Sequence, residues 1–285
     1  MSTFSVSFSS LIRLILNEYF SLIAKKSLNN MIIMFFLGGV INTLSVSEVI
    51  AAETEKDIDV SSKIFSLHLG ATRIIYDPDS TGATITVMND LDYPMLVQSE
   101  VLAEDKKNRA PFMVSPPLFR LDGLQSSRLR IVRTGGTFPY DRESLQWLCV
   151  KGIPPKADDK WAEDRVGKHQ ADKMSLQAQF SVNSCIKMFI RPSAINKGHP
   201  EDVAKQVKWF KSGDKLKGIN PTPYFINLSI LRIGEKEVKK RNYIAPFSSQ
   251  EYEFPSGSIG KIQWQVITDY GGKSRLFEAE YKTGM

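Results

Sequence analysis

Short stretches in which hydrophobic and polar residues alternate, or in which β-branched residues gather, recur along the chain from residue 64 onward. Turn residues separate them, and the pattern predicts strands at residues 64–69, 84–88, 95–101, 127–132, 145–150, 176–190, 224–233 and 262–268. No amphipathic pattern longer than about two helical turns lies between them. Many short strands at this spacing favour an all-β fold of two β-sandwiches in tandem.

One predicted strand is unusually long. Residues 174–190 contain neither Gly nor Pro, whereas most strands end after about five or six residues. Polar residues alternate there with an apolar set, so one face is apolar. That set is Met174, Leu176, Ala178, Phe180 and Val182. Two interpretations stay open: a half-buried strand that faces its own core, and an exposed apolar edge offered to another chain.

The N-terminal region has the order of a secretory signal. An apolar run at residues 31–41 follows Lys25 and Lys26 and precedes small residues that end at Ala51 and Ala52. The run is short for a membrane span. We expect residues 1–52 to be an extension and signal peptide, with Met31 as an alternative start of translation, and the mature chain to be exported.

Export bears on the two cysteines of the chain, Cys149 and Cys185. In an oxidising compartment, two cysteines are expected to pair. The alternative is a catalytic thiol, although no His lies near either Cys in the sequence. The disulfide is the favoured interpretation.

Composition narrows the remaining classes. The net charge of +6 comes from 37 basic and 31 acidic residues with interleaved signs, so we expect no nucleic-acid partner. Three His and two Cys without ligand spacing predict no metal centre and no cofactor. Neither a nucleophile elbow nor a paired-carboxylate motif supports an exported hydrolase, so we expect no enzyme.

Several motifs, in this order, give the chain a family resemblance. The most specific is residues 138–154 (FPYDRESLQWLCVKGIP), and the others are at residues 70–76, 89–94, 117–121, 186–192, 220–224 and 269–272. With them the chain resembles the PapD-like periplasmic chaperones of the chaperone/usher pathway. The extended polar segment 156–172, flanked by one Cys on each side, resembles the long-loop subclass, including the chaperones of the Yersinia pH 6 antigen and capsular antigen systems.

The resemblance implies two immunoglobulin-like domains set at an angle around a cleft, at residues 53–191 and 192–285. It implies a chaperone that binds, folds and caps fimbrial or fibrillar adhesin subunits by donor-strand complementation and delivers them to an outer-membrane usher. Arg73 and Lys187 would hold the carboxylate at the C-terminus of a subunit. The apolar set of residues 174–182 would enter the open core of the subunit.

The resemblance also implies an interdomain salt-bridge network of Glu143, Arg191 and Asp269, which would fix the angle between the domains. An exposed donor strand further predicts self-association of the free protein, with two copies capping one another. The competing hypothesis is a secreted immunoglobulin-like fibre subunit or adhesin, which is disfavoured because the chain has strands for two complete domains.

Overall fold

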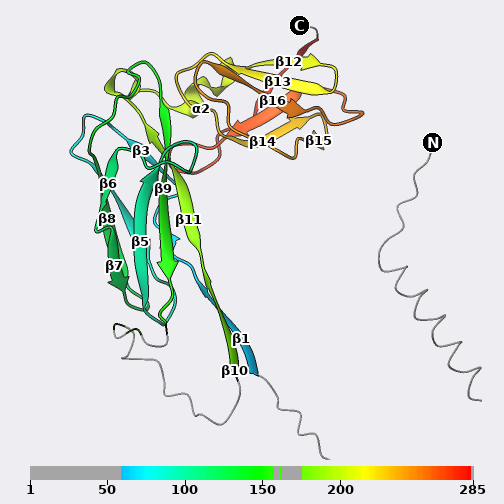
Figure 1. Cartoon of the computed structure of the whole chain (residues 1–285). Helices are drawn as coiled ribbons and strands as arrows, with labels where there is room; N and C mark the ends of the chain where they lie inside the picture. Colours follow the sequence, from blue (N-terminus) through cyan, green and yellow to red (C-terminus); the bar gives the residue numbers. More distant parts are fainter. Residues whose placement is uncertain (1–58, 157–158, 160, 162–174, 284–285) are drawn as a thin grey trace, which may run out of the picture. The chain divides into compact units, whose positions relative to one another are not determined.

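The computed structural model describes residues 59–156, 159, 161 and 175–283. They form two β-sandwiches, which confirms the prediction of an all-β chain with two such units (Figure 1). The first sandwich contains strands β2–β9 and β11, and the second contains β12–β19. Strands β1 and β10 form a separate two-stranded sheet.

The first sandwich packs a five-stranded sheet, in the order β3-β11-β9-β5-β7, against a four-stranded sheet, in the order β2-β4-β8-β6. Its strands are β2 (His68–Leu69), β3 (Arg73–Tyr76), β4 (Ala83–Met88), β5 (Met95–Leu102), β6 (Phe112–Ser115), β7 (Leu118–Leu121), β8 (Ser126–Arg133), β9 (Ser144–Ile153) and β11 (Asn183–Ile190). Along β5, buried residues alternate with more exposed ones, as expected of a strand with one face toward a core.

The second sandwich consists of two four-stranded sheets, in the orders β16-β13-β12-β19 and β15-β14-β17-β18. Its strands are β12 (Lys208–Ser212), β13 (Lys215–Asn220), β14 (Leu228–Ile233), β15 (Lys236–Glu237), β16 (Ser248–Glu253), β17 (Ile262–Val266), β18 (Phe277–Ala279) and β19 (Lys282–Thr283). In its core, Trp264 lies between Trp209 and Phe277, with ring centroids 5.5 and 5.7 Å apart.

Each sandwich has its own hydrophobic core. The buried residues of the first core run from Phe65 to Ile190, and those of the second run from Ala204 to Phe277. The segment between the cores contains only short helices: η2 (Ser193–Ile195), α2 (Pro200–Val203) and η3 (Ala204–Gln206). None of the described helices is long and apolar enough to cross a bilayer.

The predicted strands differ from the observed ones in three places. The stretch 64–69 is divided between the end of β1 (Asp59–Phe65) and β2, and residues 224–227 precede β14. The long predicted strand is interrupted at Val182, which separates β10 (Ser175–Ser181) from β11. Nine of the described strands lie outside the predicted stretches: β3, β6, β7, β12, β13, β15, β16, β18 and β19. Six of them have only two to four residues, and β12, β13 and β16 contain few apolar residues.

Candidate functional site

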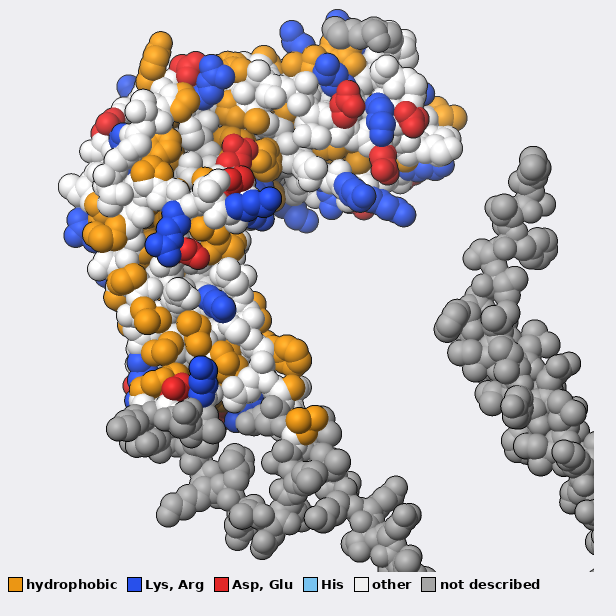
Figure 2. Space-filling view, viewed as in Figure 1, with side chains coloured by type: hydrophobic (Ala, Val, Ile, Leu, Met, Phe, Trp, Pro, Cys, Tyr) orange, Lys and Arg blue, Asp and Glu red, His pale blue; other side chains and the backbone are white. Residues whose placement is uncertain are grey.

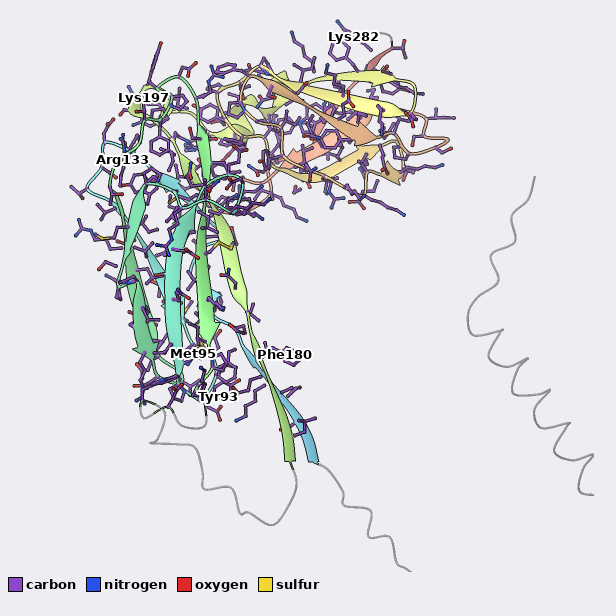
Figure 3. The ribbon with its side chains drawn as sticks, in the orientation of Figure 1. Tyr93, Met95, Arg133, Phe180, Lys197 and Lys282 are labelled. Atoms are coloured by element: carbon purple, nitrogen blue, oxygen red, sulfur yellow. A yellow bond between two sulfur atoms is a disulfide. The ribbon has the colours of Figure 1, made fainter. Side chains whose placement is uncertain are left out.

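Strand β10 leaves the first sandwich together with β1. The two strands pair in parallel, with Ile64 opposite Phe180 and Ser62 opposite Ala178 (Figure 1). Ile64, Leu176 and Phe180 are 55%, 61% and 56% exposed. Figure 2 shows hydrophobic side chains on the surface of this pair, and Figure 3 labels Phe180 on β10. Large apolar side chains are therefore in water along a regular strand.

The other residues predicted for this apolar face differ in exposure. Ala178 is half-buried within β10, and Val182 is half-buried at the break between β10 and β11. Met174 lies outside the described residues. All of these positions have the same parity as Met188 and Ile190, which are fully buried in the first core. The apolar face of the chain thus passes from a covered strand to an uncovered one.

The root of the β1–β10 pair is tightly fixed. Phe65, at the end of β1, is 1% exposed in the first core, and its carbonyl accepts the Val182 amide at 3.0 Å. A Cβ added to Gly152 of β9 would lie 2.9 Å from the Phe65 carbonyl oxygen. Only glycine therefore lets β9 approach this point without displacing the backbone.

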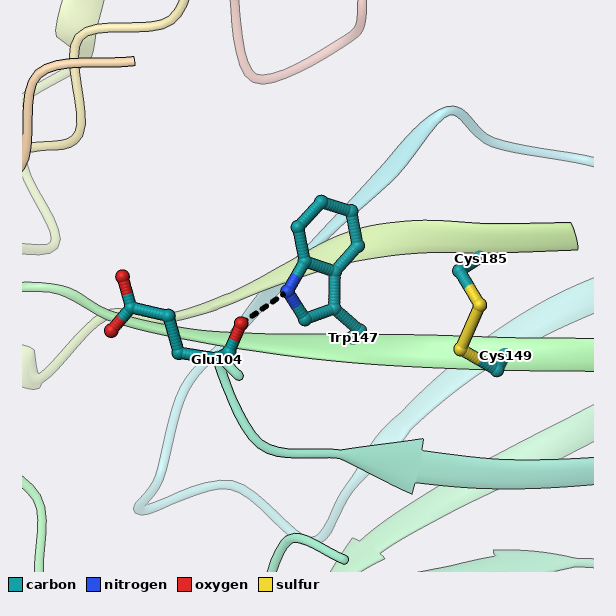
Figure 4. The surroundings of a disulfide bond; sticks show 4 residues. All are labelled: Glu104, Trp147, Cys149 and Cys185. Atoms are coloured by element: carbon teal, nitrogen blue, oxygen red, sulfur yellow. Dashed lines mark hydrogen bonds between the residues drawn. A yellow bond between two sulfur atoms is a disulfide. The ribbon is translucent and has the colours of Figure 1, made fainter. Parts of the chain in front are cut away.

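A disulfide joins β9 and β11 just inside this root. Cys149 and Cys185 are directly opposite in the antiparallel pair, with Cα atoms 4.0 Å apart and an S–S bond of 2.05 Å (Figure 4). The expected disulfide is confirmed. Two residues before Cys149, the Trp147 indole donates a hydrogen bond to the Glu104 carbonyl at 3.2 Å.

Arg73 and Lys187 lie side by side, because they occupy one register position of the parallel β3–β11 pair. Each side chain reaches residues of the second sandwich region. The Arg73 guanidinium donates to the Ile267 carbonyl at 3.3 Å, and the Lys187 ammonium donates to the Asn227 side-chain oxygen. The structure thus brings the two predicted anchor residues together between the two sandwiches.

The two charges are poorly neutralised. Within the described residues, neither Arg73 nor Lys187 has an ion-pair partner, and Arg73 Nε is buried without a hydrogen bond. Burial lowers the pKa of Arg73. Burial, with the positive charges of Arg73 and Lys106, lowers the pKa of Lys187 to about 8. Such a pair is suited to bind an anion, because the attraction of an anion would offset both the repulsion between the two cations and the cost of their desolvation.

Lys187 also lines a hollow of about 480 Å³. The other lining residues are Glu104, Lys106, Trp147, Arg241, Asn242, Tyr243 and Gln250. The Tyr243 hydroxyl donates to Glu104 Oε1 at 2.8 Å, so residues of both sandwich regions meet there. The ammonium of Lys187 lies 4.7 Å from the centre of the Tyr243 ring. The walls of the hollow are therefore cationic and aromatic.

The structure also brings together Glu143, Arg191 and Asp269. Arg191 donates to Glu143 Oε1 at 2.7 and 2.8 Å and binds both oxygens of Asp269 at 2.7 Å. The Phe225 amide donates to Glu143 Oε2 at 2.7 Å. Burial works against the charge of Asp269, but the hydrogen bonds from Arg191 and His199 outweigh it and lower its pKa. This network fastens the end of β11 to the second sandwich region.

Sequence reasoning missed several residues of these sites. His199, whose Nδ1 lies 2.8 Å from Asp269 Oδ2, carries no motif. Tyr243 and Asn227 come near Lys187 only through the arrangement of the sandwiches. The pairing of β1 with β10 was also missed, although the alternation around Ile64 gave a signal for a strand. Among the described residues, no cluster of His, Cys, Asp and Glu could hold a metal ion.

Comparisons with known proteins place these features in one family. Residues 66–196 match the model of the PapD N-terminal domain of pili and flagellar-assembly chaperones, and residues 202–278 match the PapD C-terminal domain of pili assembly chaperones. The chaperone protein AggD of Escherichia coli is 56% identical over 82% of this chain and 93% of its own length.

Two further relatives extend the comparison. The chaperone protein PsaB of Yersinia pestis is 42% identical over 78% of this chain and 86% of its own, which confirms the predicted resemblance to Yersinia chaperones. The solved structure of the Salmonella enterica SafA pilin in complex with the SafB chaperone matches with 46% identity and a TM-score of 0.69. That match covers 78% of this chain and 100% of the solved one.

Proposed function

Because this chain belongs to the PapD-like family of pilus assembly chaperones, we propose that it binds, folds and caps fimbrial or fibrillar adhesin subunits and delivers them to an outer-membrane usher. It acts by donor-strand complementation, without catalysis. The observation that carries this function is the apolar face of β10, where Leu176 and Phe180 are more than half exposed on a regular strand. Soluble proteins normally disguise such an edge.

In this function, the donor strand supplies the missing part of a subunit core. The donor residues are Met174, Leu176, Ala178, Phe180 and Val182. Burial of each large side chain would contribute about 1.5 to 3 kcal/mol, which suffices to hold a subunit that lacks one of its own strands. The complex of the SafA pilin with the SafB chaperone supports this assignment, because the related chaperone there holds a pilin.

The anchor in this function is the pair Arg73 and Lys187. Arg73 presents a planar fork to the C-terminal carboxylate of the subunit, and Lys187 adds a second charge. The absence of ion-pair partners for both residues among the described side chains supports this role. Fixing the carboxylate would set the register of the subunit along β10.

The domains of the mature protein are residues 53–191, with the donor strand, and residues 192–285. Glu143, Arg191 and Asp269 fix the angle between them, a role that fits their near-complete burial. The protein acts in the periplasm after removal of residues 1–52, a segment outside the described residues. The disulfide supports an oxidising compartment.

Co-purification with the genetically neighbouring secreted proteins tests the function. The tagged full chain should capture a subunit stoichiometrically from periplasmic extract, and Phe180→Asp, Arg73→Ala and Lys187→Ala should lose it while remaining folded. Gln179→Ala is the matched control, because Gln179 is exposed on the polar face of the same strand. Undiminished capture by folded Phe180→Asp would refute donor-strand binding.

A further inference from the structure

A strained turn lies beside the proposed anchor. Lys106, between β5 and β6, has a φ of 58°, in the left-handed region that residues other than glycine rarely occupy. The Asp105 carboxylate accepts the amides of Lys107 and Asn108 at 2.9 and 3.0 Å, and the Lys106 amide donates to the Ala103 carbonyl at 2.9 Å. The turn therefore holds Lys106 in a conformation that glycine would adopt more easily.

This conformation places the Lys106 side chain in the hollow. Its ammonium lies 3.7 Å from the centre of the Trp147 ring. The Trp147 indole donates to the Glu104 carbonyl of the same turn, and the Glu104 carboxylate accepts from Tyr243. The turn, β9 and the second sandwich region thus hold one another, so Lys106 is presented from a braced position. Backbone strain retained at such a position indicates that the side chain has a role.

The charges that line the hollow favour the binding of an anion. Its lining contains the cations Lys106, Lys187 and Arg241 and one acid, Glu104. Arg241 pairs with Glu237, and Tyr243 donates to Glu104. Within the described part of the chain, Lys106 forms no ion pair. Arg73 is not part of this lining, so the hollow offers a place for negative charge beyond the point where Arg73 and Lys187 meet.

We propose that Lys106 binds a second carboxylate of the captured subunit, the side chain of an Asp or Glu close to its C-terminus, in the hollow beside Trp147. The inference rests on the proposed function and names its partner class: subunits whose last residues include an acid. The Lys106 ammonium makes a cation–π contact with the Trp147 ring, and the partly enclosed hollow strengthens a charge-assisted hydrogen bond. The terminal carboxylate remains with Arg73 and Lys187.

Fluorescence anisotropy with the oxidised full chain tests this specificity. The probes are synthetic peptides of alternating Val and Thr, with Asp or Asn at each of the last few positions in turn, and with a free or amidated C-terminus. At one position, we expect the Asp peptide to bind about fivefold to tenfold more tightly than the Asn peptide, the order of one charge-assisted hydrogen bond in a partly exposed site. Lys106→Gln should abolish that preference.

Two further variants separate binding from folding. Lys106→Gly relieves the backbone strain, so it should keep or raise the unfolding midpoint and still lose the preference for Asp. Lys107→Gln removes the neighbouring exposed charge and should keep the preference. If amidation weakens binding while Asp and Asn peptides bind equally, the inference is wrong and the proposed function stands. If neither amidation nor the change from Asp to Asn affects binding, the inference and the proposed function both fail. The same conclusion holds if none of the peptides binds.

Discussion

Two parallel strand pairs, formed by the same two stretches of chain, have opposite surroundings. In the β3–β11 pair, the facing sheet of the first sandwich covers Tyr76, Met188 and Ile190, which are at most 1% exposed. In the β1–β10 pair, Ile64 and Phe180 have the same alternation and are more than half exposed. An apolar alternation therefore predicts a face that is buried when the protein functions. It does not tell whether the residues that bury this face belong to the same chain or to a partner.

The largest combined effect, on stability and on subunit capture, is expected from loss of the disulfide at the boundary between the two pairs. The double variant Cys149→Ser with Cys185→Ser should lower the free energy of unfolding by about 4 kcal/mol, because the link closes a long loop in the unfolded chain. Urea denaturation of the oxidised wild type and the variant measures it. The variant should also capture less subunit, since β11, which the disulfide links to β9, follows β10 in the chain after Val182. Equal unfolding midpoints would contradict the expectation.

Two side-chain truncations, one in each strand pair, test whether the apolar face is buried in one pair and exposed in the other. Met188→Ala should cost about 2 to 5 kcal/mol of unfolding free energy, because it opens a cavity in the first core. Phe180→Ala, on the same apolar face outside the sandwich, should change it by no more than about 0.5 kcal/mol while weakening subunit capture. Urea titrations of both variants provide the test. A large loss of stability in Phe180→Ala would mean that β10 is covered within its own chain.

The charge of Lys187 distinguishes stability from capture as pH rises. The pKa of Lys187 is about 8 in the folded protein and 10.5 in the unfolded chain. Between these pH values the unfolded chain binds more protons than the folded protein, so this group increases the free energy of unfolding as pH rises. Carboxylate binding should instead weaken by about tenfold from about pH 7 to about pH 9, as the ammonium loses its proton. Calorimetric titration with the captured subunit measures the second effect. Lys187→Met should bind weakly at every pH, and an unchanged pH profile in this variant would exclude Lys187 as the titrating group.

The smallest effect concerns His199, at the opposite end of β11 from β10. The hydrogen bond with Asp269 raises the pKa of His199, so its contribution to stability is complete below about pH 6.5 and is lost as pH rises through the raised pKa. The side chain is 42% exposed, and we expect a change in melting temperature of only about 1 °C. His199→Gln should remove this slope in a thermal scan at several pH values. A slope that persists in the variant would assign it to another group.

The sequence predicts the all-β class and the anomalous strand, because alternation and the placement of Gly and Pro are local properties. It predicts the disulfide because the chain has two cysteines and an N-terminal export signal. Parallel pairing of β1 with β10 is not local, since alternation identifies a strand without identifying its neighbour. Strands β12 and β13 escape for another reason, which is that their core-facing positions are not all apolar. In β13, Gly218 and Asn220 follow Leu216 on the buried face, and in β12, Lys211 follows Trp209 on the same face.

The residues of the candidate site also fall into those that the sequence predicts and those that only the fold brings together. Arg73, Lys187, Glu143, Arg191 and Asp269 stand in motifs, and the structure places them in two groups. Lys106 and Tyr243 belong to no motif, and Trp147 stands in the 138–154 motif without a predicted role. The three residues meet only because two sandwiches and a turn converge at the hollow. The left-handed backbone of Lys106 leaves no mark in the sequence either, since the preceding Asp signals a turn without its handedness.

Phe65 fixes only one end of the β1–β10 pair, and this has a consequence for motion. The carbonyl and ring of Phe65 are held at the root, whereas the pair forms a sheet of two strands only. A two-stranded ladder is marginal in water, so amide hydrogen exchange should accelerate from Val182 outward to Ser175. A subunit that docks at the root would then meet the most ordered part of β10 first. Its strand would pair with β10 residue by residue toward Ser175, because each new pair restricts the motion of the next residue.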